Sequence, residues 1–478
     1  MTAVHEAEAV PIHVVGGTPR SRRASPGRLL DTAVVIGLLI VAATVLLRAT
    51  ETVPFHGDES EWINNGRYFT FVFLDHDVTS NVWRASWVNR DQPPVGRYII
   101  GAIVWASGTA PDHVNKTYAW ERNYEANLRE GRVPGPEILV PVRRTMAVLG
   151  AVSIVLLYPA GRLIGGSVLG GTITGIVAAL AATASPLLQT YFAQARTEAL
   201  LALFSMIGLL AVLHTARRFN QTGRLPIVAW AVGPILGVAL ATKLTAAVGL
   251  VGVCAFGGVA GLLRLRANRL EGVWLLGWAF SVGALATVVW VLVNPFLWPD
   301  PVGRTWSMLE QQQSIMVEQG EQFGNPVTLS LPGRLLLMVE RTFVENSTPP
   351  FDAGRPPGSD PLMRRTFTEL PTVFGVSLEL ALAVVGLAAM LRRIVRNWRV
   401  GAFAGPETAL AWWLAGYLLG IGANLSLDWP RYYVPTAYFG ALLIGLGAQA
   451  LIGAAMFRWQ TGAGVTAQSA TARPEAAH

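Results

Sequence analysis

The stretch Leu29–Leu47 reads LLDTAVVIGLLIVAATVLL, and Asp31 is its single charged residue. Because a helix needs about 20 mostly apolar residues to cross a bilayer, this stretch predicts a membrane-spanning helix. Further apolar runs follow it along the chain: Thr145–Ala160, Val168–Leu187, Ala199–Leu213, Pro226–Ala241, Leu244–Leu263, Val273–Val293, Thr372–Leu391, Thr408–Leu425 and Val434–Phe457. The ten runs together predict an all-α, polytopic membrane protein.

The composition of the 478-residue chain also indicates a membrane protein. Hydrophobic residues make up 52% of it and charged residues 14%, whereas a soluble domain is about 25% charged. Such a chain carries more apolar surface than a soluble core could bury, which excludes an ordinary soluble, fibrous or disordered protein. The net charge of +7 comes mainly from Arg, since Lys116 and Lys243 are the only lysines, and nucleic acid is not an expected partner.

The arginines cluster in short segments, and this pattern predicts how the helices are oriented. Short cytoplasmic loops are enriched in Lys and Arg. Four groups can all be placed in the cytoplasm with ten helices: Arg20, Arg22, Arg23 and Arg28; Arg217, Arg218 and Arg224; Arg264, Arg266 and Arg269; and Arg392, Arg393, Arg396 and Arg399. Both termini are then cytoplasmic, and we expect a multi-pass protein of the plasma membrane.

One apolar run, Arg97–Ala110, is too short to be counted as a span. As a helix it would reach roughly 21 Å, less than the roughly 30 Å of a hydrocarbon core, so we expect it to lie in the outer interface. The transmembrane domain then covers 29–457, with long outer loops at 48–144 and 294–371. The segments 1–28 and 458–478, rich in Ala, Thr, Arg and Pro, are predicted to be disordered cytoplasmic tails.

A pair of adjacent carboxylates follows the first predicted helix, in the sequence His56–Glu59 (HGDE). Asp58 and Glu59 can act as a general base or bind a hard cation. A solvated acidic turn, helped by Gly57, would explain the pair as well. The position just above the bilayer, among lipid head groups, favours a functional site.

Lys243 is flanked by apolar sequence on both sides, within Pro226–Leu263. This segment is too long for one span, and Arg groups flank both its ends, so it predicts a hairpin with Lys243 at the outer turn. A lysine at membrane depth is costly and indicates a function, although it could also snorkel to the interface. An anionic lipid phosphate is the expected partner of Lys243.

Two other predicted outer segments carry charge. In Gln194–Glu198 (QARTE), Glu198 could cap the following helix or point towards Asp58. In Asp428–Tyr433 (DWPRYY), Arg431 can clamp phosphate oxygens, although the aromatic residues also fit an interfacial belt. Carboxylates and cations on one surface suggest a reaction between a lipid phosphate and an acceptor hydroxyl.

The chain resembles the polyprenyl-phosphate-dependent glycosyltransferases, which include the protein O-mannosyltransferases and the lipid A aminoarabinose transferases. The similar stretches, in the family's order, are Phe55–Glu59, Asp91–Pro94, Ala195–Glu198, Gly237–Lys243 and Arg431–Pro435. The resemblance implies a GT-C fold, a bundle of about 10–12 transmembrane helices with interfacial helices in a long first outer loop.

Two features depart from the family pattern. Gly57 stands where the O-mannosyltransferases usually carry an aromatic residue. The segment 111–144, which includes Tyr118, Trp120, Arg122 and Tyr124, matches none of the family's motifs.

The resemblance also implies an activity and a set of site residues. The activity is an inverting transfer of a sugar from a polyprenyl-phosphate donor to an acceptor hydroxyl on the outer face, the acceptor being a cell-envelope glycan, lipid or protein. Asp58 would be the catalytic acid/base, Glu59 would orient the acceptor or help hold a metal, and Glu198 would be the second acidic residue. The lipid phosphate would be bound by Lys243, Arg431 and Arg196.

The cofactor and the class of protein leave alternatives open. Asp58 must stay ionised, and either neighbouring Arg or a divalent cation (Mg²⁺ or Mn²⁺) held by Asp58 and Glu198 would keep its pKa low. No nucleotide or redox cofactor is expected, because the chain has no Walker loop or Rossmann fingerprint. A secondary transporter or lipid flippase that uses Lys243 and Glu198 is the alternative, and a non-catalytic scaffold that binds polyprenyl lipids is a third.

Overall fold

The computed structural model describes residues 26–84, 86–111, 114–323, 327–344, 372–373 and 376–471. These residues are largely helical, and the strands among them form one short antiparallel hairpin, β1 (Thr372–Val373) with β2 (Val376–Ser377). The helices of the bundle are α1 (Pro26–Thr52), α6 (Pro136–Val155), α7 (Leu157–Ile164), α8 (Val168–Ala184), α9 (Pro186–Ala193), α10 (Glu198–Thr222), α11 (Val232–Thr242), α12 (Ala246–Ala267), α13 (Arg269–Leu292), α16 (Leu378–Arg399), α17 (Pro406–Asn424) and α18 (Val434–Thr471). The predicted all-α fold class is confirmed.

The two predicted outer loops contain helices of their own. These are α2 (Gly57–Asn64), α3 (Trp87–Asp91), α4 (Pro94–Ala106), α5 (Tyr124–Arg129), α14 (Pro301–Phe323) and α15 (Leu331–Phe343). Short helical turns complete the described chain: η1 (Asn65–Arg67), η2 (Thr70–Leu74), η3 (Asn81–Trp83), η4 (Ile227–Ala231), η5 (Pro295–Leu297) and η7 (Pro430–Tyr432). The run predicted to lie in the interface is the short helix α4.

Each predicted span contains a helix, but fewer than ten of these helices are long and apolar throughout. Six helices among the described residues meet both conditions: Leu29–Thr52, Pro136–Ile164, Glu198–Thr222, Ala246–Ala267, Arg269–Leu292 and Val434–Trp459. The pair α8–α9, bent by 68°, makes a seventh if it is counted as one span. The chain is therefore a multi-pass membrane protein. The remaining predicted spans differ because η4 and α11 are short, α16 carries charge at both ends, and Trp, Tyr and Gly lower the hydropathy of α17.

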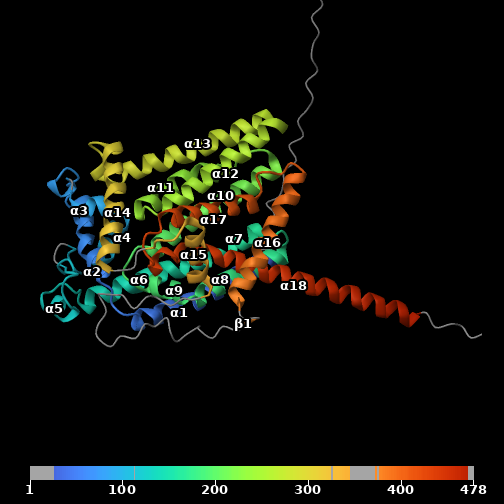
Figure 1. The fold of residues 1–478 in the computed structure, drawn as a ribbon, viewed down its shortest axis with the longest axis horizontal. Helices are drawn as coiled ribbons and strands as arrows, with labels where there is room; N and C mark the ends of the chain where they lie inside the picture. Colours follow the sequence, from blue (N-terminus) through green and yellow to red (C-terminus); the bar gives the residue numbers. More distant parts are fainter. Residues whose placement is uncertain are drawn as a thin grey trace, which may run out of the picture.

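The helices pack as a layered bundle with α10 near its middle. Helix α10 contacts α6, α11 and α17, while α1 packs on α6, α8 and α9, and α18 packs on α8 and α16. Helix α13 packs on both α12 and α11, and α11 packs on α10. In Figure 1 the outer-loop helices α2, α3, α4, α5 and α14 gather at one end of these helices, whereas α15 packs on α17. Large apolar side chains such as Phe280 and Ile40 stay exposed on the outside of the bundle, as expected for a surface that contacts lipid.

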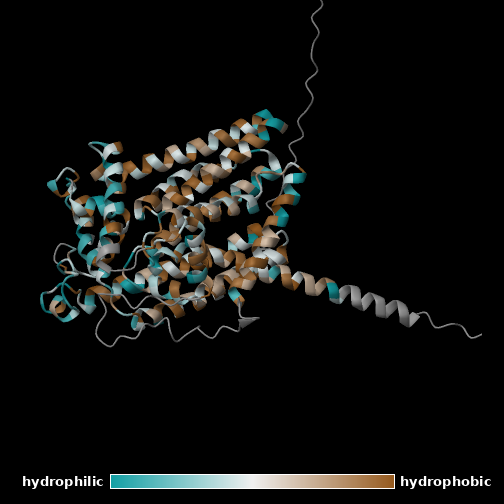
Figure 2. Cartoon of the chain, in the orientation of Figure 1, coloured by the Kyte–Doolittle hydropathy of each residue, from teal (hydrophilic) through white to brown (hydrophobic). Residues whose placement is uncertain are grey.

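The arginine groups of α10 and α16 meet at one end of the bundle. Arg217 Nη1 lies 3.5 Å from the carbonyl oxygen of Arg162, and Arg393 Nη1 donates to the carbonyl of Ile164 at 2.7 Å. The beginning of α1 lies at the same end, because Asp31 pairs with Arg162 at 3.3 Å. Figure 2 shows hydrophilic residues at both ends of the bundle and apolar residues along the middle.

The group between α12 and α13 lies at this end as well. Arg264 pairs with Glu271 at 3.5 Å, and the Glu271 carboxylate lies next to Gly223 at the end of α10, where an added Cβ would be 2.8 Å from it. The groups were predicted to share one side of the membrane, and the packing places those that are described at one end. Arg20, Arg22 and Arg23 lie outside the described residues.

Two helix boundaries differ from the predicted spans. Helix α6 begins at Pro136 rather than Thr145, because Pro is favoured in the first turn and the Arg143–Arg144 pair is accommodated within the helix. Helix α18 continues to Thr471, past the expected end at 457, and Figure 1 shows its last turns projecting away from the bundle. Much of the predicted 294–371 loop, from 345 onwards, lies outside the described residues.

Candidate active site

The acidic helix α2 starts a few residues after α1 ends, at the end of the bundle opposite the arginine groups. His56 caps it: the His56 Nδ1 accepts a hydrogen bond from the Asp58 N–H at 3.0 Å, and the Glu59 carboxylate accepts one from the His56 N–H at 3.0 Å. This reciprocal capping satisfies backbone donors that a helix start leaves free. It fixes the direction in which Asp58 and Glu59 leave the helix.

Asp58 lies between two guanidinium groups from distant parts of the chain. Its Oδ2 is 2.7 Å from Arg196 Nη2, in the loop before α10, and 3.0 Å from Arg431 Nη1, in the turn before α18. Arg196 is 2% exposed, whereas the Asp58 side chain is 17% exposed. The carboxylate is therefore held firmly on one side and still reachable from another.

A second ion pair joins the first through Arg196. Lys243 Nζ donates to Glu198 Oε1 at 2.7 Å, and the same oxygen lies 3.6 Å from Arg196 Nη2. Lys243 sits at the turn of the predicted hairpin, between α11 and α12. The residues predicted from four separate segments therefore form one continuous network, in which no step between neighbours exceeds 3.6 Å.

Aromatic rings hold two of these cations in place. The Arg431 guanidinium lies 4.3 Å from the ring centre of Trp429 and 5.4 Å from that of Tyr432. The Arg196 guanidinium lies 5.1 Å from the Tyr191 ring centre. An aromatic face attracts a cation and limits its rotation. The sequence left an interfacial belt as the alternative for the aromatic residues of Asp428–Tyr433. Two of them, Trp429 and Tyr432, contact Arg431.

The electrostatics of the network keep Asp58 charged. Burial alone would raise the pKa of Asp58, but the positive charges of Arg196 and Arg431 outweigh it and hold this pKa well below its usual range. The same attraction works on Arg431, whose pKa stays above its ordinary value despite burial, through its neighbours Tyr432 and Asp58. Asp58 is therefore ionised, and able to accept hydrogen bonds, at every physiological pH.

Glu59 faces away from this network, into the bundle. Its side chain is fully buried, and Arg143 of α6 binds both of its oxygens, at 2.6 Å and 2.7 Å. The Ala195 N–H donates to Glu59 Oε2 at 2.8 Å. Arg143 also donates to carbonyls at the end of α1, such as that of Val53 at 2.9 Å. Glu59 therefore ties together α2, α6, the end of α1 and the loop that carries Arg196.

Three neighbours of Asp58 were not assigned as site residues from the sequence. Glu61 is one helical turn after Asp58, and Trp120 Nε1 donates to its Oε1 at 3.3 Å. Asp91 Oδ1 accepts from Gln312 of α14 at 2.6 Å, which links the two outer loops. The i, i+3 spacing of Asp58 and Glu61 was a usable signal, whereas nothing local in the sequence points from Asp58 to Trp120.

The two neighbouring acids differ from Asp58 in their titration. Burial and the negative charge of Asp58 raise the pKa of Glu61 to about 8. Burial also raises the pKa of Asp91 to about 6, although the positive charge of Arg431 opposes the shift. The site thus contains a permanently ionised carboxylate beside a carboxyl group that is mostly neutral at pH 7.

The donor set does not fit a divalent cation. Among the described residues, no group of three or more His, Cys, Asp or Glu side chains is arranged to hold a metal ion. Asp58 and Glu198 already face three cationic side chains, so the network carries one positive charge in excess. A cluster with an excess of positive charge repels a metal cation and attracts an anion.

Some polar atoms of the network are buried without a hydrogen-bond partner among the described residues. These atoms are Glu198 Oε2, Arg196 Nε and Thr197 Oγ1. Buried polar groups are normally paired, and an orphaned one at a site calls for a partner. They leave hydrogen-bonding capacity for a bound ligand on the side where Arg196 and Glu198 meet.

Comparisons with solved structures return an oligosaccharyltransferase, ArnT and a protein O-mannosyltransferase complex. The Archaeoglobus fulgidus oligosaccharyltransferase in the apo form is 14% identical, with a TM-score of 0.49 over 93% of this chain and 53% of that chain. ArnT from Cupriavidus metallidurans bound to undecaprenyl phosphate is 15% identical, with a TM-score of 0.44 over 89% and 60%. The S. cerevisiae protein O-mannosyltransferase complex bound to the sugar donor is 15% identical, with a TM-score of 0.35 over 59% and 34%.

The similarity concerns the arrangement of helices. This chain spans about half the length of the oligosaccharyltransferase. No family model matches the chain, and no curated protein matches it. What the site does follows from its own residues.

Proposed function

We propose that the protein is an inverting glycosyltransferase of the GT-C type that moves a sugar from a polyprenyl-phosphate donor to an acceptor hydroxyl. The observation that carries this proposal is the single network in which ionised Asp58 meets Arg196 and Arg431, joined to the Lys243–Glu198 pair. It combines a proton acceptor with a cluster that has an excess of one positive charge. A sugar phosphodiester carries one negative charge and fits that excess.

The cations account for the leaving group. In an inverting transfer, the acceptor oxygen attacks the anomeric carbon while the bond from that carbon to the phosphate oxygen breaks, and the electron pair leaves with the phosphate. Lys243, Arg431 and Arg196 would stabilise the growing phosphate charge, because they are fixed in place by pairing and aromatic contacts before substrate arrives. The acceptor proton passes to Asp58 as the new bond forms.

Donor binding would also adjust the basicity of Asp58. In the ligand-free network, Arg196 and Arg431 keep the pKa of Asp58 low, which makes it a weak base. A bound phosphate would share the charge of these two guanidiniums and reduce their effect on Asp58. The proton affinity of Asp58 would therefore rise when the donor is in place, so that proton transfer is coupled to donor binding.

Glu59 would act as a positioning residue rather than as a metal ligand or an acceptor-binding group. Both of its oxygens are taken by Arg143 and the Ala195 N–H. Its contribution is to hold α2 against the loop that delivers Arg196. Because the donor set of Asp58 and Glu198 does not fit a divalent cation, the charge of the phosphate would be balanced by the three cationic side chains of the network.

We also propose that the site faces the extracytoplasmic side of the plasma membrane. The network lies at the end of the bundle opposite the arginine groups. Because short cytoplasmic loops are enriched in arginine, that opposite end would be the extracytoplasmic one. The donor would be membrane-embedded, and the acceptor would be a cell-envelope glycan, lipid or protein. Lys243 and Glu198 pair with each other inside the same network as Asp58, an arrangement that does not favour the transporter alternative.

A transfer assay tests the proposal. Membranes that contain the full chain are incubated with undecaprenyl phosphate carrying radiolabelled mannose, glucose or arabinose, and released or transferred sugar is counted. We expect turnover of at least one donor by wild type and none above background by Asp58→Asn. Equal turnover by both proteins, or ion-coupled uptake without turnover, would contradict the proposal.

A further inference from the structure

The indole of Trp120 lies directly beside the acidic helix, although its segment matches none of the family's motifs. Its ring centre is 5.8 Å from that of His56 and 5.1 Å from that of Tyr118. Its Nε1 donates to Glu61 Oε1 at 3.3 Å. Trp120 is only partly buried, so an aromatic surface and a carboxyl group stand together next to Asp58.

Gly57 makes room for this indole. A Cβ added at Gly57 would lie 2.7 Å from Cη2 of Trp120 and 2.9 Å from Cδ1 of Tyr118, closer than real contacts allow. Any larger residue would therefore push the indole away from α2. The O-mannosyltransferases usually carry an aromatic residue at this position. Here the position is a glycine, and the aromatic ring beside α2 comes from Trp120 in another segment.

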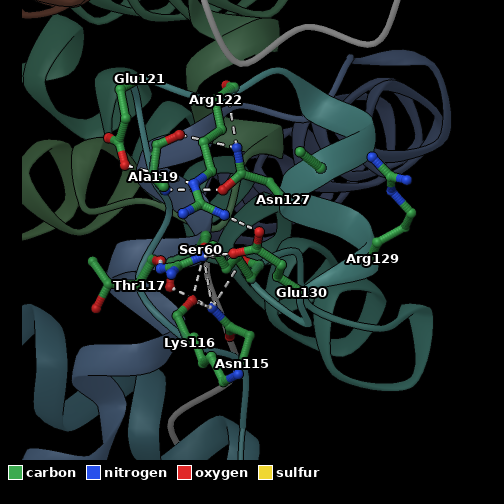
Figure 3. A network of polar contacts seen from close by, with 12 residues as sticks. Ser60, Asn115, Lys116, Thr117, Ala119, Glu121, Arg122, Asn127, Arg129 and Glu130 are labelled. Carbon is green, nitrogen blue, oxygen red and sulfur yellow. Dashed lines mark hydrogen bonds and ion pairs between the residues drawn. The ribbon is translucent and has the colours of Figure 1, made fainter.

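A dense polar network holds the Trp120 segment against α2 (Figure 3). Asn115 Nδ2 donates to the carbonyl of Ser60 at 3.0 Å and to Ser60 Oγ at 2.7 Å. Ser60 Oγ in turn donates to the carbonyls of Lys116 and Arg132. Ser60 and Asn115 are buried, and Asn115 Oδ1 is left without a partner among the described residues, but the bonds from Asn115 Nδ2 and Ser60 Oγ tie the segment to α2 in several places. The segment is thus built onto the helix that carries Asp58.

A second clip acts next to Trp120 itself. The Asn127 side chain accepts from the Ala119 N–H at 2.9 Å and donates to the Ala119 carbonyl at 3.0 Å. Asn127 is fully buried, and Figure 3 shows it facing Ala119. The N–H and the carbonyl of Ala119, the residue before Trp120, are therefore both bound by the Asn127 side chain. Such precision is unnecessary for a solvent-exposed loop and is typical of a preorganised binding group.

Trp120 and Glu61, both only partly buried, have the chemistry that recognises a sugar. One face of a sugar ring presents C–H bonds with partial positive charge, and the face of an indole is the negative part of its quadrupole. The sugar hydroxyls need partners that both donate and accept. Burial and the charge of Asp58 raise the pKa of Glu61 to about 8, so its carboxyl group is mostly neutral at pH 7 and can do both.

We infer that Trp120 and Glu61 form a sugar subsite, in which the indole stacks on a sugar ring and the Glu61 carboxyl group hydrogen-bonds its hydroxyls. The inference rests on the proposed function, since it names the ligand class next to Asp58. The sugar belongs either to the lipid-linked donor or to the acceptor. Both sources present the same ring and hydroxyl chemistry, and binding measurements can distinguish them.

Two binding measurements on the purified full chain in nanodiscs test the subsite. The first compares affinity for undecaprenyl phosphate with affinity for the same lipid carrying mannose, glucose or arabinose. The second follows binding of the methyl glycosides of these sugars by saturation-transfer NMR, with undecaprenyl phosphate present. The variants are Trp120→Ala, Trp120→Phe, Glu61→Ala and Glu61→Gln, with Trp105→Ala as the matched control, an exposed tryptophan in the same outer loop.

We expect Trp120→Ala and Glu61→Ala to lower sugar binding by about ten-fold or more in one of the measurements, because each removes direct contacts. Binding of undecaprenyl phosphate without a sugar should stay within about two-fold. Glu61→Gln should keep most of the binding, since an amide also donates and accepts. A loss confined to the lipid-linked sugar assigns the donor sugar, and a loss confined to methyl glycosides assigns the acceptor.

The inference is overturned if the alanine variants and wild type bind every sugar equally, or if wild type prefers no sugar in either measurement. Should Trp120→Ala fail to fold, Trp120→Phe keeps an aromatic ring while losing the N–H donor to Glu61 and part of the stacking surface, and it should bind sugar less tightly than wild type. Failure of the proposed function is recognised separately, as a wild type that neither binds undecaprenyl phosphate nor turns over any labelled donor. Sugar binding that depends on Trp120 would survive that result.

Discussion

Two carboxylates adjacent in the sequence occupy opposite regions of this molecule. Asp58 belongs to an open region, where it is partly exposed and shared between guanidiniums from two distant loops. Glu59 belongs to a closed region, where it is fully buried and held by Arg143. Successive helical residues point about 100° apart, which is enough to send one side chain into the site and the other into the bundle.

The difference shows how one short motif can both build and operate a site. The closed pair fixes α2 to α6, to the end of α1 and to the loop that carries Arg196. Arg196 and Arg431 hold the open carboxylate from its other side. We expect substitutions at Asp58 to act mainly on activity, because Arg196 keeps Glu198 as a partner, and substitutions at Glu59 to act mainly on stability, because they leave Arg143 buried without its counter-charge.

The open region gives the largest expected effect. Asp58→Asn removes the charged proton acceptor while keeping the size of the side chain. We expect the rate of sugar transfer to fall by about 10³-fold, within the 10²–10⁴-fold that a positioned general base contributes. The rate is measured with the radiolabelled donor that wild type turns over best.

Thermal unfolding supplies the control for this variant. Asp58→Asn removes one counter-charge of Arg196, which keeps Glu198 at 3.6 Å, so its unfolding midpoint should fall less than that of Glu59→Gln and the variant should stay folded at the assay temperature. Full transfer by a well-expressed Asp58→Asn would mean that the open carboxylate is not the proton acceptor.

The closed region should show itself in stability. Glu59→Gln leaves Arg143 buried without its counter-charge, and breaking a buried pair from one side costs about 3–5 kcal/mol. We expect a marked fall in the midpoint of thermal unfolding. The double variant Glu59→Gln with Arg143→Met should recover part of the loss, because it removes the uncompensated charge as well.

A neighbouring ion pair offers a matched control. Arg144 and Glu51 are 3.7 Å apart and mostly exposed, at 58% and 68%. Glu51→Gln should cost at most about 1 kcal/mol, as for other surface pairs. An equal loss of stability from Glu51→Gln and Glu59→Gln would remove the distinction between closed and open regions.

The sequence predicted the contents of the open region better than those of the closed one. Asp58, Arg196, Glu198, Lys243 and Arg431 are rare charged residues beside apolar helices, so each was visible as an exception. The hairpin turn at Lys243 also followed from segment length and flanking charge. The order of the motifs supported a family resemblance but did not show that these residues meet. The ion pairs show that they do.

The closed region escaped prediction for a physical reason. Glu59 and Arg143 are separated by 84 residues, and their contact depends on how α2 and α6 pack. Trp120 and Glu61 are likewise brought together by long-range contacts, such as the Ser60–Asn115 network. Periodicity and composition report the environment of a single segment. They carry no information on which distant residue neutralises a buried charge.

The phosphate-binding side of the open region should give the next effect. Lys243→Met keeps most of the side-chain length and removes one charged donor from the network. Because a hydrogen bond to a charged group contributes about 1.5–3 kcal/mol, we expect undecaprenyl phosphate to bind roughly 10–100-fold more weakly. Lys116→Met, an exposed lysine in the first outer loop, is the control and should leave the affinity unchanged. Unchanged affinity in Lys243→Met would place the lipid phosphate elsewhere.

The smallest expected effect lies on the boundary between the two regions, at Glu61. Its pKa is raised from 4.5 to about 8 in the folded protein, by burial and by Asp58, while His56 and the Trp120 N–H oppose the shift and Asp91 adds to it. The unfolded chain therefore releases this proton at lower pH than the folded chain does. The preference for the neutral form stabilises the fold near pH 4.5, and this stabilisation is lost progressively as the pH rises to about 8.

Glu61→Gln is neutral at every pH, so its unfolding midpoint, relative to that of wild type, should increase from pH 5 to pH 8 and then level off. A difference that stays constant over this range would show that Glu61 is ionised beside Asp58, and that the open region holds two negative charges rather than one.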